Sequence, residues 1–153
     1  MRAGAVAVDL DGALGDTRPL WRDWLEAAAP VFGLDPATLP DDRAEAAVEL
    51  DRLGAGNWRT LLERWSEERA AVYLHRDPRA SAALRMLSAD GRKIGVFTDA
   101  PEPLARIALS QLGADRRVVV LETGASALER LLERLGDDTV VVGTRVELSM
   151  LAT

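Results

Sequence analysis

Four short apolar runs, rich in valine and separated by helical segments, constrain the fold of this chain more than any other feature. The runs are short and rich in β-branched residues, which is typical of buried strands. They occupy residues 5–11, 93–98, 117–121 and 139–143. Strands joined by helices form a parallel sheet with helices packed on its faces. The sequence therefore predicts a Rossmann-like α/β fold with a doubly wound parallel sheet.

The connections between these strands differ greatly in length. Each of the last two holds one predicted helix, at residues 103–112 and 126–135. The first is about 80 residues long, and its apolar spacing predicts helices at 19–28, 44–53, 58–73 and 80–89. We interpret this long connection as an inserted α-helical cap. The predicted division is a core of residues 1–14 and 86–153 with a cap of residues 15–85.

Composition excludes several classes of protein. The chain has 153 residues, 48% of them hydrophobic, which suffices for the core of one domain. Its net charge of −6 argues against non-specific binding to nucleic acid. The absence of cysteine excludes disulfides and thiolate sites and fits a cytoplasmic protein. The sequence suggests neither a signal peptide nor a membrane helix, so no membrane partner is expected.

Polar residues end or follow each predicted strand. Ligands of open α/β sheets bind at the carboxyl ends of the strands, so these residues are the candidate site. They are Asp9, Asp11 and Gly12, then Thr98 and Asp99, then Glu122 and Thr123, and finally Thr144 and Arg145.

The pair Asp9 and Asp11 carries the clearest chemistry. Two carboxylates at a strand end could share Mg²⁺, and one of them could attack phosphorus while the other serves as general acid and base. Gly12 would allow close approach of a phosphate, and Thr98 could donate to a phosphoryl oxygen. The alternative is that both aspartates only end the strand and cap the following turn, and the residues alone leave both interpretations open.

Two segments resemble the haloacid dehalogenase superfamily. DLDGALGDT at residues 9–17 is similar to its first signature, DxDGTLxDS/T, and IGVFTD at 94–99 is similar to its second. The long helical insertion looks like the cap of the phosphoglycolate phosphatase and β-phosphoglucomutase branch. The resemblance implies that Asp9 is a nucleophile, Asp11 an acid/base and a metal ligand with Asp9, and Thr98 a phosphate ligand. It also implies Mg²⁺ as cofactor and a small phosphorylated metabolite as substrate.

The other two signatures of that superfamily are degenerate here. The third supplies a lysine, but residues 121–126 contain neither lysine nor arginine. Lys93, the one lysine, begins a strand roughly 16 Å from the site. The fourth supplies metal-binding aspartates, and Thr144 and Ser149 stand in their places. Arg145, Glu122 or Glu147 would have to compensate for these losses.

Two functions follow as expectations. The first is a phosphatase that hydrolyses a small phosphomonoester weakly, through an aspartyl-phosphate on Asp9. The second is a pseudoenzyme that keeps the fold to bind a phosphorylated ligand or a protein, and a truncated relative without function of its own is a third. Phosphate would be bound by Thr98, Asp99, Gly12 and Arg145, while Mg²⁺ binding is expected to be weak or absent. The cap, which holds the four tryptophans, is the candidate surface for a homodimer or a protein partner.

Overall fold

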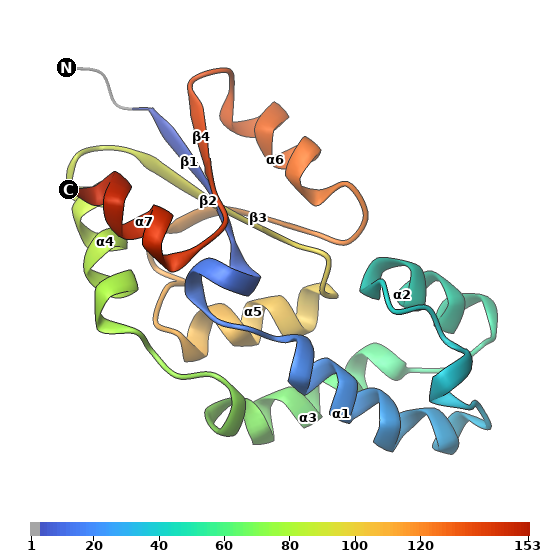
Figure 1. The fold of residues 1–153 in the computed structure, drawn as a ribbon. Coiled ribbons are helices and arrows are strands. Elements are labelled where there is room, and N and C mark those ends of the chain that lie inside the picture. Colours follow the sequence, from blue (N-terminus) through green and yellow to red (C-terminus); the bar gives the residue numbers. More distant parts are fainter. Residues whose placement is uncertain (1–3) are drawn as a thin grey trace.

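A computed structural model describes residues 4–153 of the chain as a parallel sheet with helices on both faces and a helical layer beyond one end (Figure 1). The sheet has the strand order β3-β2-β1-β4. Its strands are β1 (Ala5–Asp9), β2 (Lys93–Thr98), β3 (Val118–Thr123) and β4 (Thr139–Val142). The predicted fold class is therefore confirmed. The first strand is two residues shorter than predicted, because the chain turns immediately after Asp9.

Three helices belong to the layer beyond the sheet and four pack on the sheet itself. They are α1 (Arg18–Ala28), α2 (Arg43–Arg52), α3 (Trp58–Tyr73), α4 (Pro78–Ala89), α5 (Glu102–Gln111), α6 (Ala127–Leu135) and α7 (Arg145–Ala152). Six of them lie where apolar spacing predicted helices. The seventh, α7, was not predicted. Its first turn is stabilised by Thr144, whose hydroxyl accepts a hydrogen bond from the backbone N–H of Glu147.

The faces of the sheet are covered unequally. Helices α4, α5 and α7 contribute to one apolar cluster with the side chains of Val6, Val8, Ile94 and Val96. Helix α6 lies on the opposite face (Figure 1). There, a Cβ atom on Gly95 would lie 2.6 Å from a methyl group of Leu131. Glycine at this position therefore lets α6 approach β2 closely.

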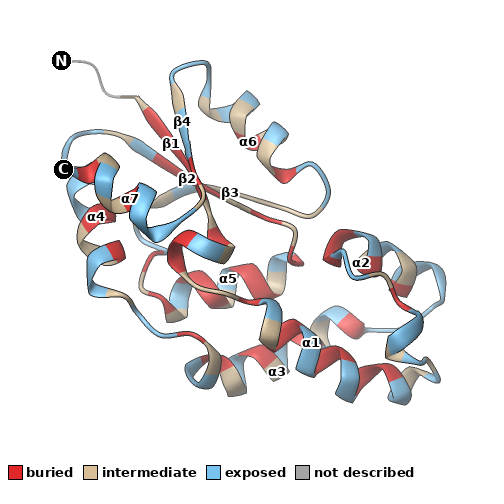
Figure 2. Cartoon of the chain, viewed as in Figure 1, coloured by how far each residue is buried: buried red, intermediate tan, exposed pale blue. Residues whose placement is uncertain are grey.

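The cap has its own apolar cluster, visible as the buried inner faces of α1 and α3 in Figure 2. Trp21, Trp24 and Trp58 are buried, and their ring centroids lie 5.2 to 6.4 Å apart. The cluster continues onto Ala100 and Leu104 of the core. These three tryptophans thus pack inside the molecule, and the cap packs against the start of α5.

Helix α4 spans the predicted boundary between cap and core at residues 85 and 86. It packs against α7 and β2 on the sheet. Asp77 precedes it and accepts a hydrogen bond from the backbone N–H of Ala80, so α4 begins at a capped end. Within the described residues, no helix is long and apolar enough to cross a membrane.

Parallel pairing brings the carboxyl ends of the strands to one edge. Asp9 lies beside Phe97, and Val8 lies beside Val142. Thr98 lies beside Thr123 at the ends of β2 and β3. The segments that follow the four strands are therefore neighbours at this edge, facing the cap.

Candidate functional site

The turn after β1 places both aspartates at the strand-end edge. Residues Leu10–Leu14 form one wide turn, in which the backbone N–H of Asp11 donates to Oδ1 of Asp9 at 3.1 Å. Gly12 has φ +131°, and a Cβ atom there would lie 2.5 Å from the carbonyl oxygen of Gly143. Glycine is thus required for the turn to pass the end of β4. The N–H of Gly12 donates to the carbonyl of Gly15 at 2.9 Å, so it is engaged within the turn.

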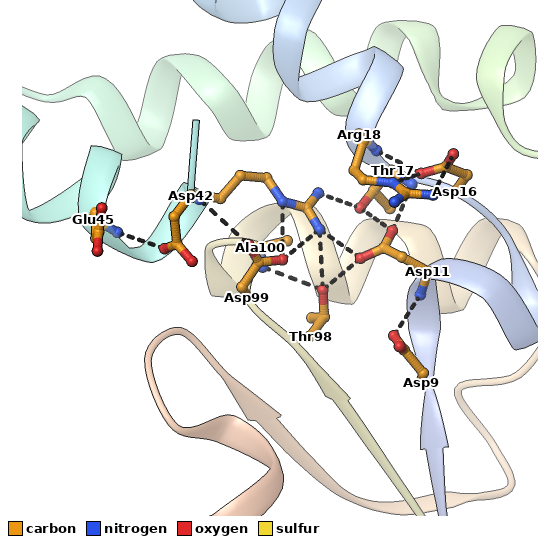
Figure 3. Close-up of polar contacts among 11 residues, drawn as sticks. Asp9, Asp11, Asp16, Thr17, Arg18, Asp42, Glu45, Thr98, Asp99 and Ala100 are labelled. Carbon is orange, nitrogen blue, oxygen red and sulfur yellow. Dashed lines mark hydrogen bonds and ion pairs between the residues drawn. The ribbon is translucent and has the colours of Figure 1, made fainter. Parts of the chain in front are cut away.

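Asp11 is fully engaged by its surroundings (Figure 3). Its Oδ1 accepts hydrogen bonds from the backbone N–H and the hydroxyl of Thr17, at 2.7 and 2.6 Å. Its Oδ2 accepts from the hydroxyl of Thr98 at 2.8 Å and from Nη2 of Arg43 at 2.5 Å. Both carboxylate oxygens therefore have two donors each. The proton of the Thr98 hydroxyl is also directed to Asp11.

Arg43 enters this site from the first residue of α2, in the cap. Its side chain is 3% exposed. Nη2 and Nε donate to Oδ1 of Asp99 at 2.7 and 3.1 Å, and the backbone N–H of Arg43 donates to Oδ2 at 3.3 Å. Nη1 donates to the hydroxyl of Thr17 at 2.6 Å. One guanidinium thus joins the cap to the turn after β1 and to the end of β2.

The pKa values of Asp9 and Asp11 are shifted in opposite directions. Burial raises the pKa of Asp9 to about 6, helped by the negative charges of Asp11 and Asp99. Burial also acts to raise the pKa of Asp11. The charge of Arg43 and the hydrogen bonds from Thr17 and Thr98 outweigh it, and hold the pKa of Asp11 below its ordinary value. At neutral pH both are carboxylates, but only Asp11 is neutralised by a partner.

A cleft of about 480 Å³ opens between the strand ends and the loop before α6. Its lining includes Asp9, Asp11, Thr98 and Asp99 from the predicted site, together with Arg43. Within residues 4–153, Asp9 accepts one hydrogen bond, the one from Asp11. The structure therefore brings the predicted residues Asp9, Asp11, Thr98 and Asp99 to one cleft, and among its three aspartates Asp9 accepts the fewest hydrogen bonds.

Arg145 does not reach that cleft. It lines a separate cleft of about 570 Å³, together with Gly12 and the two segments that connect cap and core. Its side chain is 51% exposed, and its nearest acidic partner is Asp77 at 3.9 Å. The structure thus separates Arg145 from Thr98 and Asp99, with which the sequence grouped it as a phosphate ligand.

The carboxylates at the ends of β3 and β4 serve local structure. Glu122 accepts hydrogen bonds from Arg130 and Arg134 of α6, at 2.9 and 2.8 Å. Glu147 accepts from the backbone N–H of Gly143 and the hydroxyl of Thr144, at 3.0 and 3.2 Å. Neither faces the cleft that contains Asp9. Their predicted role as substitute ligands therefore has no support in their contacts.

These residues do not fit a divalent cation. Mg²⁺ is held by several hard oxygen ligands, usually including carboxylates that are not otherwise engaged. Among residues 4–153, no three acidic, histidine or cysteine side chains are grouped so as to hold a metal ion. Both carboxylate oxygens of Asp11 are already occupied by donors.

Sequence reasoning missed Arg43, because nothing in its local pattern links it to strands that are distant along the chain. One signal was available. Arginine at the first residue of a helix opposes the helix dipole, which favours acidic residues there. Such a residue needs a compensating partner, and here the partners are the carboxylates at the ends of β1 and β2. Thr17 was noticed only as the last residue of the first signature.

Comparison with solved structures identifies the fold. A structure of CbbY from Rhodobacter sphaeroides in complex with phosphate has TM-score 0.66 and 17% identity, over 92% of this chain and 77% of that one. A phosphatase of the haloacid dehalogenase type from Thermococcus onnurineus has TM-score 0.57 and 19% identity, over 92% and 76%. A predicted phosphoglycolate phosphatase from Haemophilus somnus has TM-score 0.62 and 16% identity, over 99% and 83%.

The chain therefore has the fold of haloacid dehalogenase-type hydrolases that carry a helical cap after the first strand. This agrees with the resemblance of residues 9–17 and 94–99 to the signatures of that superfamily. No protein-family model matches the sequence, and no curated protein matches it either. At these low identities the similarity defines the fold, and the function has to be argued from the site.

Proposed function

We propose that this chain binds a small phosphomonoester in the strand-end cleft and hydrolyses it slowly through Asp9, with a strong preference for esters that have good leaving groups. The observation that carries this proposal is the unequal engagement of the two aspartates. Asp9 has one hydrogen bond within the described residues, whereas Asp11 has four, one of which is the ion pair with Arg43. A nucleophile must be free to move toward phosphorus, and of the two aspartates of the first turn only Asp9 is free to do so.

The covalent step follows from the state of Asp9. Above pH 6 its carboxylate is ionised, since its pKa is raised only to about 6. A carboxylate oxygen forms a bond to phosphorus while the ester P–O bond breaks, and the leaving oxygen takes the electron pair. Water then hydrolyses the aspartyl phosphate, which releases phosphate and restores the carboxylate. The burial and negative neighbours that raise the pKa of Asp9 also make it a stronger base than an ordinary aspartate.

Asp11 limits which esters can react. It is held ionised by Arg43, Thr17 and Thr98, so it carries no proton for the leaving oxygen. Loss of a general acid costs about 10²–10⁴-fold in rate for poor leaving groups. An aryl oxygen leaves readily as an anion, whereas an alkyl oxygen needs the proton. The low turnover of alkyl phosphates is therefore a consequence of the ion pair between Asp11 and Arg43.

The shortage of unpaired positive charge in the cleft also supports weak turnover. Phosphoryl transfer depends mainly on positioning and on positive charge around the transferring group. Here the guanidinium of Arg43 is shared between Asp11 and Asp99. The hydroxyl proton of Thr98 is directed to Asp11. One structural neighbour, CbbY from Rhodobacter sphaeroides, was crystallised with phosphate, which supports a phosphorylated ligand for this fold.

The test is a comparison of leaving groups. p-Nitrophenyl phosphate represents aryl esters and glycerol phosphate represents alkyl esters. We expect slow hydrolysis of the first, no measurable hydrolysis of the second, and loss of activity in Asp9→Asn. Asp16→Asn is the matched control, since Asp16 lies nearby but pairs with Arg18 at 2.7 Å on the surface. Equal rates for both esters, or activity that persists in Asp9→Asn, would overturn the proposal.

A second candidate is a binding module without turnover. Arg43 favours it, because this side chain fills the space between Asp11 and Asp99 with a cation that cannot take part in acid–base chemistry. If no ester is hydrolysed but phosphate protects the folded chain against thermal unfolding, and Asp9→Asn leaves that protection unchanged, this candidate replaces the first.

The organisation of the chain around this site is part of the proposal. The contacts of α4 support a cap of residues 15–77 with α4 assigned to the core, rather than the predicted cap of residues 15–85. The exposed faces of the cap remain the surface that we predict for a homodimer or a protein partner. The composition without cysteine supports a cytoplasmic location.

A further inference from the structure

Arg43 is unusual in its burial. Among the residues of 4–153 that are buried as whole residues, it alone carries a formal charge. A buried charge is unfavourable unless it is paired and its hydrogen-bonding groups are satisfied. The buried N–H groups of this guanidinium need hydrogen-bond acceptors, and those acceptors must surround it.

The acceptors come from two segments that follow neighbouring strands. The turn after β1 supplies the carboxylate of Asp11 and the hydroxyl of Thr17. The end of β2 supplies the carboxylate of Asp99, with the hydroxyl of Thr98 at 3.4 Å. All are hard oxygen atoms, the type that also binds small divalent cations. Four carboxylates, those of Asp9, Asp11, Asp99 and Glu129, line the same cleft, and its other arginine, Arg18, is exposed and paired with Asp16. A buried cation is therefore favoured at this place.

We propose that Arg43 is the resident cation of this site and excludes a divalent metal ion from it. The guanidinium occupies Oδ2 of Asp11 and Oδ1 of Asp99, so neither oxygen is available to a metal ion. A second cation would also be repelled by the arginine at short range. The cap thus supplies through a side chain the charge that the ends of β3 and β4 do not supply. This inference concerns the same site as the proposed hydrolysis, but it is tested by metal binding, so the two can fail separately.

The test is a titration with Mn²⁺, followed by electron paramagnetic resonance of the free ion. Three proteins are compared: the wild type, Arg43→Met, and the control Arg52→Met. Arg52 lies on the same helix, is 66% exposed and pairs with Glu49. We expect weak binding that is equal in the wild type and in Arg52→Met. Arg43→Met should bind at least about tenfold more tightly, and Asp9→Asn in that background should remove the gain.

Stability gives a second measurement that does not depend on the titration. Removal of Arg43 leaves Asp11 and Asp99 without their cation, so Arg43→Met should melt at a lower temperature than the wild type. Millimolar Mg²⁺ should restore part of that loss in Arg43→Met and leave the melting temperature of the wild type unchanged. If Arg43→Met is unfolded in metal-free buffer, recovery of the folded state on addition of Mg²⁺ supports the inference equally.

Two results would overturn the inference. One is a wild-type protein that binds Mn²⁺ as tightly as Arg43→Met does, through Asp9. The other is an Arg43→Met protein that gains neither metal affinity nor stability from Mg²⁺, while the double variant Arg43→Met, Asp11→Asn regains stability. The second result would mean that the guanidinium only balances a buried charge, in a place that a metal ion cannot use.

Discussion

The two halves of the strand-end edge use their charged residues differently. At the ends of β1 and β2, Asp11 and Asp99 face one another across a shared guanidinium. At the end of β3, Glu122 binds two arginines of α6, and after β4, Glu147 of α7 accepts hydrogen bonds from Gly143 and Thr144 just before its own helix. The first half joins parts of the chain that are distant in sequence, whereas the second stabilises local turns.

This difference shows where the site obtains its positive charge. A phosphoryl-transfer site needs cations on several sides of the transferring group. The β3–β4 half contributes none to the cleft that contains Asp9, since Arg130 and Arg134 are directed to Glu122. The positive charge comes from the cap instead, from the buried Arg43 and the exposed Arg18. The chemistry of the site is therefore coupled to the docking of α2 against the core.

The largest effect should come from removing the guanidinium that is shared at the ends of β1 and β2. Arg43→Met leaves two carboxylates near each other without a cation, and loss of one partner from a buried ion pair costs about 3–5 kcal/mol. We expect a decrease of that size in the free energy of unfolding, measured with urea. Arg52→Met, on the same helix but exposed, should change it far less, because surface ion pairs contribute little. Equal effects of the two substitutions would mean that the pairing of Arg43 contributes no more than a surface ion pair.

A second substitution disturbs the close approach between the turn after β1 and the end of β4. Gly12→Ala would place a Cβ atom 2.5 Å from the carbonyl of Gly143, at a φ that disfavours side chains. We expect a loss of about 2–4 kcal/mol in the free energy of unfolding. Gly124→Ala is the matched control, because Gly124 also has a positive φ but no atom within 4 Å of the added Cβ. It should lose about 1 kcal/mol, from backbone strain alone. A smaller loss for Gly12→Ala than for Gly124→Ala would contradict the close approach.

The difference between local contacts and contacts distant in sequence also explains what the sequence could predict. Strands and six helices followed from apolar periodicity, which is a local property of the chain. Asp9, Asp11 and Thr98 could be predicted because they follow strands whose carboxyl ends must meet. Arg43 could not, since its position depends on how the cap docks, and no local pattern records that. Arg145 was grouped with the site because it follows a strand, but α7 begins there and carries it to another cleft.

A third prediction concerns the carboxylate of Asp9. The pKa of Asp9 is raised to about 6 in the folded state. Its ionisation therefore destabilises the fold as pH rises from about 4 through 6. Asp9→Asn removes that ionisation, so it should be more stable than the wild type at pH 7, by about 1–2 kcal/mol because solvent screens this half-exposed carboxyl. The difference should vanish below pH 4, as urea unfolding across that range would show. A variant that is less stable than the wild type at pH 7 would mean that Asp9 has a stabilising partner.

The smallest effect is expected in the β3–β4 half. Glu147→Gln keeps an oxygen that can accept from the backbone N–H of Gly143, so only the charge at the start of α7 is lost. We expect a decrease of about 0.3–1 kcal/mol in the free energy of unfolding and no change in the hydrolysis of p-nitrophenyl phosphate. Loss of hydrolysis in this variant would place Glu147 at the reaction site and remove the contrast between the two halves.

The most direct test of the account is to follow the carboxyl ¹³C resonances of Asp9 and Asp11 by NMR as pH is varied. The account predicts that Asp9 titrates near pH 6 and that Asp11 titrates below its ordinary range. In Arg43→Met the pKa of Asp11 should move upward, since its cation is gone. The reverse order in the wild type, with Asp11 holding its proton above the pKa of Asp9, would contradict the account, because Asp11 would then be available as a general acid.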